Sequence, residues 1–187
     1  MFSVIRGLYC SLFGKRNYRV LVVGLYGAGK STFVQALCER FRGAERKNVI
    51  PTIGLDMESI AVLGKNMTLW DLGGMEEFLS GWKNFYPEAE GLVFVVDSSD
   101  RETVSRAKEI FGEVMKEKEL SGIPIVVICN KSDLYGGIEF SVFKTIFHPF
   151  FNNRDAGDTG IFSVSSLSGE GADEAMGWVS KRIHHKK

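Results

Sequence analysis

The chain has 187 residues, enough for one domain with a sizeable core, and no proline/serine-rich or low-complexity tract divides it. Its 23 basic and 23 acidic residues cancel, which argues against a nucleic-acid-binding protein, since such proteins need an excess of lysine and arginine. The three cysteines lie far apart and match neither a disulfide framework nor a metal site, which favours a reducing cytosolic compartment. The longest apolar runs are far too short to cross a membrane. We expect a monomeric protein, soluble or peripheral, with a single domain over residues 17–187.

Residues 1–16 are predicted to form an N-terminal amphipathic helix and linker. Apolar side chains of residues 2–13 fall along one helical face, and basic residues follow at 15, 16 and 19. One interpretation places this helix on a membrane surface, held by buried apolar area and by anionic lipid. The other packs it permanently on the domain, and a helix that alternates between the two sites would unite them. Phe2 stands where a myristoylation signal needs glycine, so the helix must act without that acyl chain.

A phosphate loop follows the first predicted strand. Residues 18–23 are a short apolar run typical of a buried strand, residues 24–32 fit G-x-x-x-x-G-K-[ST], and helical spacing continues to Phe41. Glycines let backbone N–H groups converge on phosphate oxygens at a helix N-terminus, Lys30 would reach the β- and γ-phosphates, and Ser31 would offer a hydroxyl to Mg²⁺. The predicted nucleotide-binding residues of this loop are Gly24, Leu25, Tyr26, Gly27, Ala28, Gly29, Lys30, Ser31 and Thr32.

The rest of the chain alternates between strands and helices. A hairpin over 57–72 precedes buried strands at 91–96, 125–129 and 160–164, with helices expected over 101–120, 138–151 and 171–184. This order predicts an α/β fold, in which a mostly parallel six-stranded sheet carries helices on both faces. The ligand site should then lie at the carboxyl ends of the strands.

Two loops at those strand ends carry polar residues suited to a nucleoside phosphate. Asp71 ends an apolar strand and is followed by glycines, so it suits an outer-shell role, through water, toward Mg²⁺, while the Gly74 N–H could meet a terminal phosphate. The sequence N-K-S-D at residues 130–133 would be unremarkable in a surface turn. Here it follows a buried strand in a chain that carries a phosphate loop, which favours a ligand-binding role. We therefore expect these loops to meet the phosphate loop in one crevice.

The residues after the last two strands select the base. The Asp133 carboxylate can accept from both N1–H and the 2-amino group of guanine, whereas adenine lacks that amino group and has an acceptor at N1. Such a mismatch costs discrimination on the order of 10⁴, so GTP and GDP are the predicted ligands. Lys131 would cover the base, and the Ser166 backbone N–H would meet its carbonyl oxygen. The predicted base-binding residues are Asn130, Lys131, Asp133, Ser165, Ser166 and Leu167.

Together these motifs resemble the Arf/Arf-like branch of the Ras-type small GTPases. The sequences G-L-x-x-A-G-K-S-T, P-T-I-G, W-D-L-G-G and N-K-S-D stand in order and cover nearly the whole chain. Residues 1–2, 7–9 and 122–124 look most like the Golgi-associated Arf-related proteins. The resemblance implies a P-loop small G domain that is peripheral on Golgi or other endomembranes and acts in vesicle-mediated transport. It also implies an exchange factor, a GTPase-activating protein and effector proteins as partners.

The resemblance also implies residue roles. Thr52 would coordinate Mg²⁺ directly in the GTP state, and residues near 48–56 and 71–86 would be the first and second switch segments. In the GTP state the γ-phosphate would hold Thr52 and Gly74 in the site, and the hairpin would shift and expel the N-terminal helix towards the membrane. Without the γ-phosphate these contacts would be lost and the helix would fold back onto the domain. Three apolar residues fall at the family's effector-contact positions, although ordinary half-buried packing would also explain them. These residues are Leu55, Trp70 and Phe85.

Two residues depart from the family pattern. Met75 stands where the family has a glutamine that orients the attacking water, and a thioether accepts weakly and donates nothing. Tyr26 places a bulky aromatic in the phosphate loop, where attacking water or a partner's arginine would sit, although its hydroxyl could add a polar group. The predicted catalytic positions are Lys30, Thr52, Gly74 and Met75. Because Met75 replaces the glutamine, we expect weak intrinsic GTP hydrolysis, at or below about 10⁻⁴ s⁻¹. The alternative function is a nearly non-hydrolysing, GTP-bound scaffold; a phosphotransferase kinase is disfavoured because no segment supplies a second-substrate lid.

Overall fold

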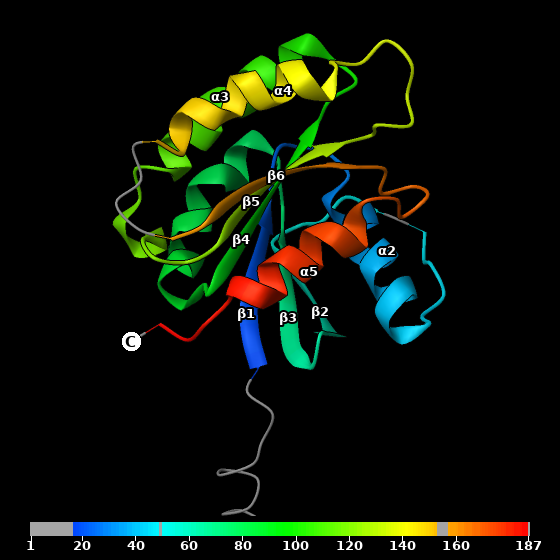
Figure 1. Cartoon of the computed structure of the whole chain (residues 1–187), viewed down its shortest axis with the longest axis vertical. Coiled ribbons are helices and arrows are strands. Elements are labelled where there is room, and N and C mark those ends of the chain that lie inside the picture. The colour runs from blue at the N-terminus through cyan, green and yellow to red at the C-terminus, as the bar shows by residue number, and fades with distance from the viewer. Residues whose placement is uncertain (1–16, 49, 153–156, 187) are drawn as a thin grey trace, which may run out of the picture.

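A twisted six-stranded sheet forms the centre of the domain in the computed structural model, which describes residues 17–48, 50–152 and 157–186 (Figure 1). The strand order is β2-β3-β1-β4-β5-β6, and β2 pairs antiparallel with β3 while the other neighbours are parallel. The predicted fold class, a mostly parallel sheet with helices on both faces, is confirmed. The strands are β1 (Asn17–Val23), β2 (Leu55–Val62), β3 (Lys65–Leu72), β4 (Gly91–Asp97), β5 (Ile125–Asn130) and β6 (Thr159–Val164).

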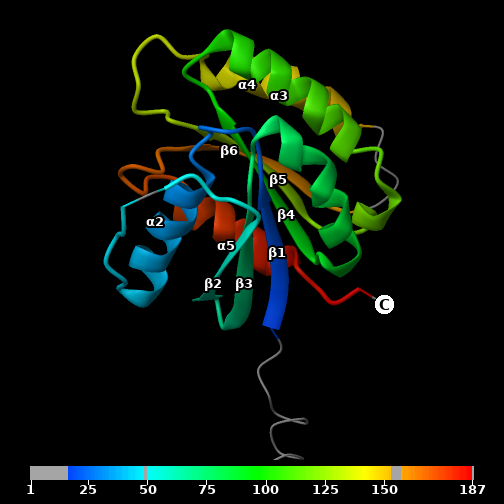
Figure 2. The same ribbon diagram turned by 180° about the vertical axis from the view of Figure 1, so that it is seen from behind.

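Helices cover the two faces of the sheet and bury two separate clusters of apolar side chains. Successive residues of β1 alternate between the clusters, because side chains in a strand point to opposite faces: Val20 and Val22 join one cluster, Leu21 and Val23 the other. The first cluster includes α2 (Lys30–Arg42) and α5 (Ala172–Arg182); the second includes α3 (Arg101–Val114), α4 (Phe140–Phe147) and the 3-10 segment η1 (Glu76–Glu88). Helix α5 accordingly lies in front of the sheet in Figure 1 and behind it in Figure 2.

Three helix predictions were too long, and one helical segment was not predicted. Helix α3 ends at Val114, and the short 3-10 segment η2 (Lys118–Leu120) follows it. Helix α4 ends at Phe147 because Pro149 has no N–H to continue the α-helix, and the 3-10 segment η3 (His148–Phe150) follows it. The last helix ends at Arg182 and the chain continues extended. The unpredicted segment η1 contains Gly81 and Pro87, which are poor helix formers.

The C-terminal residues after α5 fold back onto the domain. The Lys186 ammonium group donates to the carbonyl oxygens of Tyr86 at 2.9 Å, Pro87 at 3.3 Å and Glu119 at 2.5 Å. The His185 ring stacks on Tyr18 with centroids 4.4 Å apart and hydrogen-bonds to the buried Glu90 carboxylate. This tail therefore joins α5 to the start of β1 and to the end of η1. These contacts lie at the amino-terminal end of β1, opposite the nucleotide loops.

The predicted N-terminal helix, residues 2–13, lies outside the described residues. Within the part of the chain that the structure describes, no helix combines the length and the apolar character needed to cross a bilayer.

Candidate nucleotide-binding site

The phosphate loop runs from the end of β1 into the first turn of α2. Gly29 starts the helix with a left-handed φ of 89°, and a Cβ there would lie 2.3 Å from Asn130 Nδ2, so only glycine fits. Within the described chain, no side chain caps α2 and its first turn holds no acidic residue. The free N–H groups and dipole of this helix terminus therefore face the loop, which is the arrangement that favours a phosphate anion.

Lys30 lies buried beneath this loop and beside the second switch segment. Its ammonium group donates to the Leu25 carbonyl oxygen at 3.0 Å. Burial lowers the pKa of Lys30, and the nearby Asp71 charge partly opposes that shift. A Cβ on Gly74 would lie 2.4 Å from Lys30 Nζ and 2.3 Å from the Gly24 carbonyl oxygen. Glycine at position 74 is therefore what allows the second switch segment to approach the lysine so closely.

Three side-chain oxygens converge where the sequence predicts Mg²⁺. Ser31 Oγ donates to Asp71 Oδ2 at 2.5 Å, lies 2.9 Å from Thr52 Oγ1, and Thr52 donates to the same carboxylate oxygen at 3.4 Å. Burial raises the pKa of the Asp71 carboxyl group, while the hydrogen bond from Ser31 and the charge of Lys30 oppose the rise. The residues predicted as metal ligands, which come from three separate segments, are thus in mutual contact.

This oxygen cluster fits a hard divalent cation. Asp71 Oδ1 is buried and has no hydrogen-bond partner among the described residues, so one acceptor of the cluster is unused. Hydroxyl and carboxylate oxygens, completed by water and phosphate, are the ligands that Mg²⁺ prefers. In the described ranges no group of three or more histidine, cysteine, aspartate and glutamate residues could hold a metal.

A cleft of about 300 Å³ opens over the phosphate loop, within the range of small-molecule sites. Its walls come from the phosphate loop and from both switch segments, so the residues predicted to hold the terminal phosphates surround one space. Tyr26 lines the cleft although 62% of it is exposed, and Met75, which is half-buried, follows the cleft residue Gly74 at the start of η1. The lining residues are Tyr26, Gly27, Gly29, Lys30, Ser31, Thr32, Ile50, Pro51, Thr52 and Gly74.

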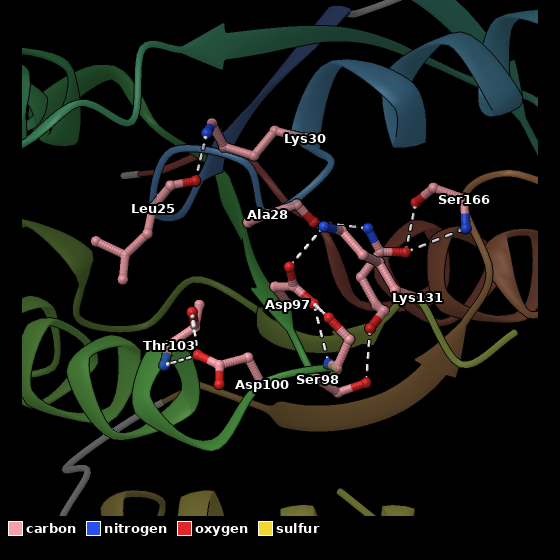
Figure 3. Close-up of polar contacts among 11 residues, drawn as sticks. Leu25, Ala28, Lys30, Asp97, Ser98, Asp100, Thr103, Lys131 and Ser166 are labelled. Carbon is pink, nitrogen blue, oxygen red and sulfur yellow. Dashed lines mark hydrogen bonds and ion pairs between the residues drawn. The ribbon is translucent and has the colours of Figure 1, made fainter. Parts of the chain in front are cut away.

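The phosphate-loop residue Ala28 and the base-loop residue Ser166 are both labelled in Figure 3, and the side chain of Asn130 hydrogen-bonds to both. Its Nδ2 donates to the Ala28 carbonyl oxygen at 2.7 Å, and its Oδ1 accepts from Ser166 N at 3.1 Å and Ser166 Oγ at 2.7 Å. Ser165 Oγ donates to Asp133 Oδ1 at 2.6 Å. The carboxylate predicted to read guanine is exposed but oriented by a buried serine, and Leu167 beyond it is exposed.

Lys131 adopts a left-handed backbone conformation with φ of 64°, which is strained for a residue with a side chain. Its ammonium group pairs with Asp97 Oδ2 at 2.5 Å. Asp100, three positions further on, caps helix α3 by accepting from the Thr103 N–H at 2.8 Å. Asp97 has a different role, because it holds the lysine that is predicted to cover the base.

The three predicted effector-contact residues are half-buried. Trp70 and Phe85 meet edge to face with ring centroids 5.8 Å apart, and both, like Leu55, pack against the cluster under α3. The packing that was the alternative explanation is therefore present, and the effector role stays a prediction.

Several polar contacts at the site were not predicted from the sequence. Trp82 Nε1 donates to the Gly73 carbonyl oxygen at 2.9 Å, and Arg106 pairs with Glu76 at 3.0 Å, so both residues hold the second switch segment. Arg46 donates to the Leu167 carbonyl oxygen at 2.5 Å. The Arg106 and Arg46 contacts join residues 30 and 121 positions apart, and neither arginine stands in a motif. The strand-end position of Asp97 was the one available signal.

Comparisons with known proteins agree with this geometry. The model of the ADP-ribosylation factor family matches residues 5–183. ADP-ribosylation factor-like protein 3 of Saccharomyces cerevisiae is 33% identical over 190 residues, covering 100% of this chain and 96% of that protein. ADP-ribosylation factor-related protein 1 of Rattus norvegicus is 34% identical over 187 residues, covering 98% and 93%.

Among solved structures, the Arl6 BBS3 small GTPase of Trypanosoma brucei with the bound nucleotide analogue GppNp superimposes with a TM-score of 0.76. It is 22% identical, and the match covers 89% of this chain and 96% of that one. At that identity the likeness concerns the fold.

Proposed function

The chain belongs to the ADP-ribosylation factor family, and we propose that it is a GTP-binding switch that recruits effector proteins in membrane traffic. One observation carries the proposal: loops following β1, β3, β5 and β6 bring the phosphate loop, Asp71, the 130–133 loop and the 165–167 loop together at the carboxyl edge of one sheet. Members of the family bind GTP and GDP with Mg²⁺ and interact with exchange factors, GTPase-activating proteins and effectors.

The phosphate half of the site binds and orients the terminal phosphates. The N-terminus of α2 directs free N–H groups at the β-phosphate, and Lys30, freed from the Leu25 carbonyl oxygen, donates to the β- and γ-phosphates. Ser31 and Thr52 would hold Mg²⁺ directly and Asp71 through water, in keeping with the contacts among them. The chemistry that Mg²⁺ supplies when bound is neutralisation of negative charge on the phosphate oxygens. Closure of Thr52 and Gly74 over the phosphate loop would shield the phosphates from bulk solvent.

The base half of the site selects guanine. Asp133 accepts from two guanine donors, Lys131 covers the ring, and the Ser166 backbone N–H donates to the base carbonyl oxygen. Asn130 makes three hydrogen bonds to Ala28 and Ser166 and keeps its second amide N–H for the base. The base and phosphate halves therefore share one rigid connection.

We propose that hydrolysis is slow. Met75 follows Gly74 directly, and its thioether cannot both accept a proton from water and donate to the γ-phosphate. Tyr26 lines the same cleft and is more than half exposed, so its ring can occupy the space of the attacking water. An activating protein would have to supply the missing polar groups.

The same two residues favour a second candidate function, a scaffold that stays loaded with GTP. The nucleotide that co-purifies with the full-length protein separates the two functions. GDP in the purified protein supports a hydrolysing switch, and intact GTP supports the scaffold.

The membrane part of the proposal rests on residues 2–13, and it places the protein peripherally on Golgi or other endomembranes. The test is co-sedimentation of the full-length protein with anionic liposomes, loaded with GDP or with a non-hydrolysable GTP analogue. We expect the GTP form to pellet with the liposomes and the GDP form to remain in the supernatant. Equal partitioning of the two forms would reject the release of the N-terminal helix, and failure to bind labelled GDP would reject the switch itself.

A further inference from the structure

Arg46 links the start of the first switch segment to the loop after β6. It lies between the end of α2 and Thr52, and its Nη1 donates to the carbonyl oxygens of Leu167 at 2.5 Å and Ser166 at 3.3 Å. Its Nε donates to the Glu39 carboxylate on α2 at 2.6 Å. Only 28% of the arginine side chain is exposed. Three of its contacts are charge-assisted, the stronger kind of hydrogen bond.

The loop that Arg46 holds is the one that faces the base. Ser166 uses its N–H and hydroxyl on Asn130 Oδ1, at 3.1 and 2.7 Å, while its carbonyl oxygen accepts from Arg46. The preceding Ser165 orients Asp133. One short loop is therefore held from its inner side by Asn130 and from its outer side by Arg46.

The contact also restricts the first switch segment. Thr52 lies six positions after Arg46, so a chain fixed at Arg46 can carry Thr52 no farther than about 20 Å. The guanidinium group bonds the 165–167 loop on one side and Glu39 of α2 on the other, so the chain that leads into the first switch segment is anchored to that loop.

We infer that Arg46 is a positioning residue that retains the bound guanine nucleotide, by anchoring the 165–167 loop to α2 and to the chain that leads into the first switch segment. The inference rests on the proposed function, since it concerns regulation of the same site. On this inference, the hydrogen bonds from Arg46 to the 165–167 loop must break when the nucleotide exchanges. An exchange factor that displaces the segment containing Arg46 releases the base as well as the phosphates.

The test is the dissociation rate of fluorescently labelled GDP from the full-length protein, chased with excess unlabelled GDP. Arg46→Ala should speed dissociation about tenfold, the effect of losing a charged hydrogen-bond donor at a covered site. Arg46→Lys keeps the charge without the planar fork and should return the rate to within about threefold of wild type. Glu39→Gln should speed release less than Arg46→Ala and add nothing to it, because it acts only through the arginine.

Arg40→Ala is the matched control. Arg40 lines the same groove as Arg46 but pairs with Asp173 on α5 at 2.5 Å and does not bond the 165–167 loop. Release at the wild-type rate from Arg46→Ala, or equal acceleration in Arg40→Ala, would overturn the inference while leaving the switch intact. Absence of labelled-GDP binding by the wild-type protein would overturn the inference and the proposed function together. The Lys and Gln variants keep the test decisive if Arg46→Ala fails to fold.

Discussion

The side chain of Asn130 donates to the backbone of Ala28 at 2.7 Å across 102 positions of sequence, and so ties the base-binding loop to the phosphate loop. Both residues are buried. The two halves of the nucleotide site are thus held at a fixed separation before any ligand binds, and the contact can be tested by mutation.

Asn130→Ala should destabilise the domain as well as the site. It leaves the Ala28 carbonyl oxygen and the Ser166 N–H without partners in a buried place, and each unsatisfied group costs about 1–3 kcal/mol. We expect the free energy of unfolding in urea, without nucleotide, to fall by about 3 kcal/mol. Asn84→Ala, at an exposed position, is the control and should change it little. Equal stability of Asn130→Ala and wild type would show that the contact does not hold the loops.

Met75→Gln should increase intrinsic GTP hydrolysis. The amide supplies the acceptor and donor that the thioether lacks, so a wild-type rate at or below about 10⁻⁴ s⁻¹ should rise at least about tenfold. Single-turnover release of phosphate from GTP-loaded protein measures it. Met57→Gln, on the exposed side of β2, is the matched control. A wild-type rate that is already fast would contradict the expectation.

Tyr26→Ala tests the second departure separately. If the ring crowds the attacking water, the double variant with Met75→Gln should hydrolyse GTP faster than Met75→Gln alone. If the phenol hydroxyl contributes to catalysis, the double variant should be slower. The same single-turnover assay distinguishes the two.

Asp133→Ala should remove base discrimination. The wild-type protein should prefer GDP to ADP by on the order of 10⁴, because the carboxylate accepts from guanine and repels the adenine acceptor. Competition of GDP and ADP against labelled GDP measures the preference, which should fall below about 100 in the variant. Ser132→Ala, at the neighbouring exposed position, should keep it. Undiminished preference in Asp133→Ala would assign guanine recognition elsewhere.

The Asp97–Lys131 pair should give a pH-dependent contribution to stability. Burial alone would raise the pKa of the Asp97 carboxyl group, but hydrogen bonds from Lys131 and Ser99 outweigh it and hold that pKa below the usual 3.8. A lowered pKa in the folded state stabilises the fold above pH 3.8, and the contribution disappears as pH falls through the folded pKa. Asp97→Asn should therefore cost about 2 kcal/mol near neutral pH and progressively less in acid.

Urea unfolding of wild type and Asp97→Asn across this pH range provides the measurement. Glu113→Gln removes a comparable pair with Lys116 in which both side chains are about 70% exposed, and it should change stability little at any pH. A difference for Asp97→Asn that is independent of pH would show that the carboxylate charge is not what matters.

Strand-end residues could be predicted from sequence, and long-range contacts could not. Ser31, Asp71 and Asp133 each follow an apolar run, and the rule that parallel strands share a carboxyl edge places them in one crevice. The end of α3 was missed because neither glycine nor proline occurs between Val114 and Leu120. Arg46 was missed because its partners lie 120 positions away, and nothing in its neighbours indicates which carbonyl groups the fold brings near.

The folded-back C-terminal tail decides where a reporter group can be attached. Stacking of His185 on Tyr18 brings the end of the described chain beside the first residues of β1, from which residues 2–13 are only a few positions away. The phosphate loop lies at the other end of this seven-residue strand, roughly 20 Å away. Under the membrane role proposed for residues 2–13, a fluorophore joined to the C-terminus should therefore respond to lipid and stay insensitive to the nucleotide, whereas a bulky fusion there should weaken liposome binding.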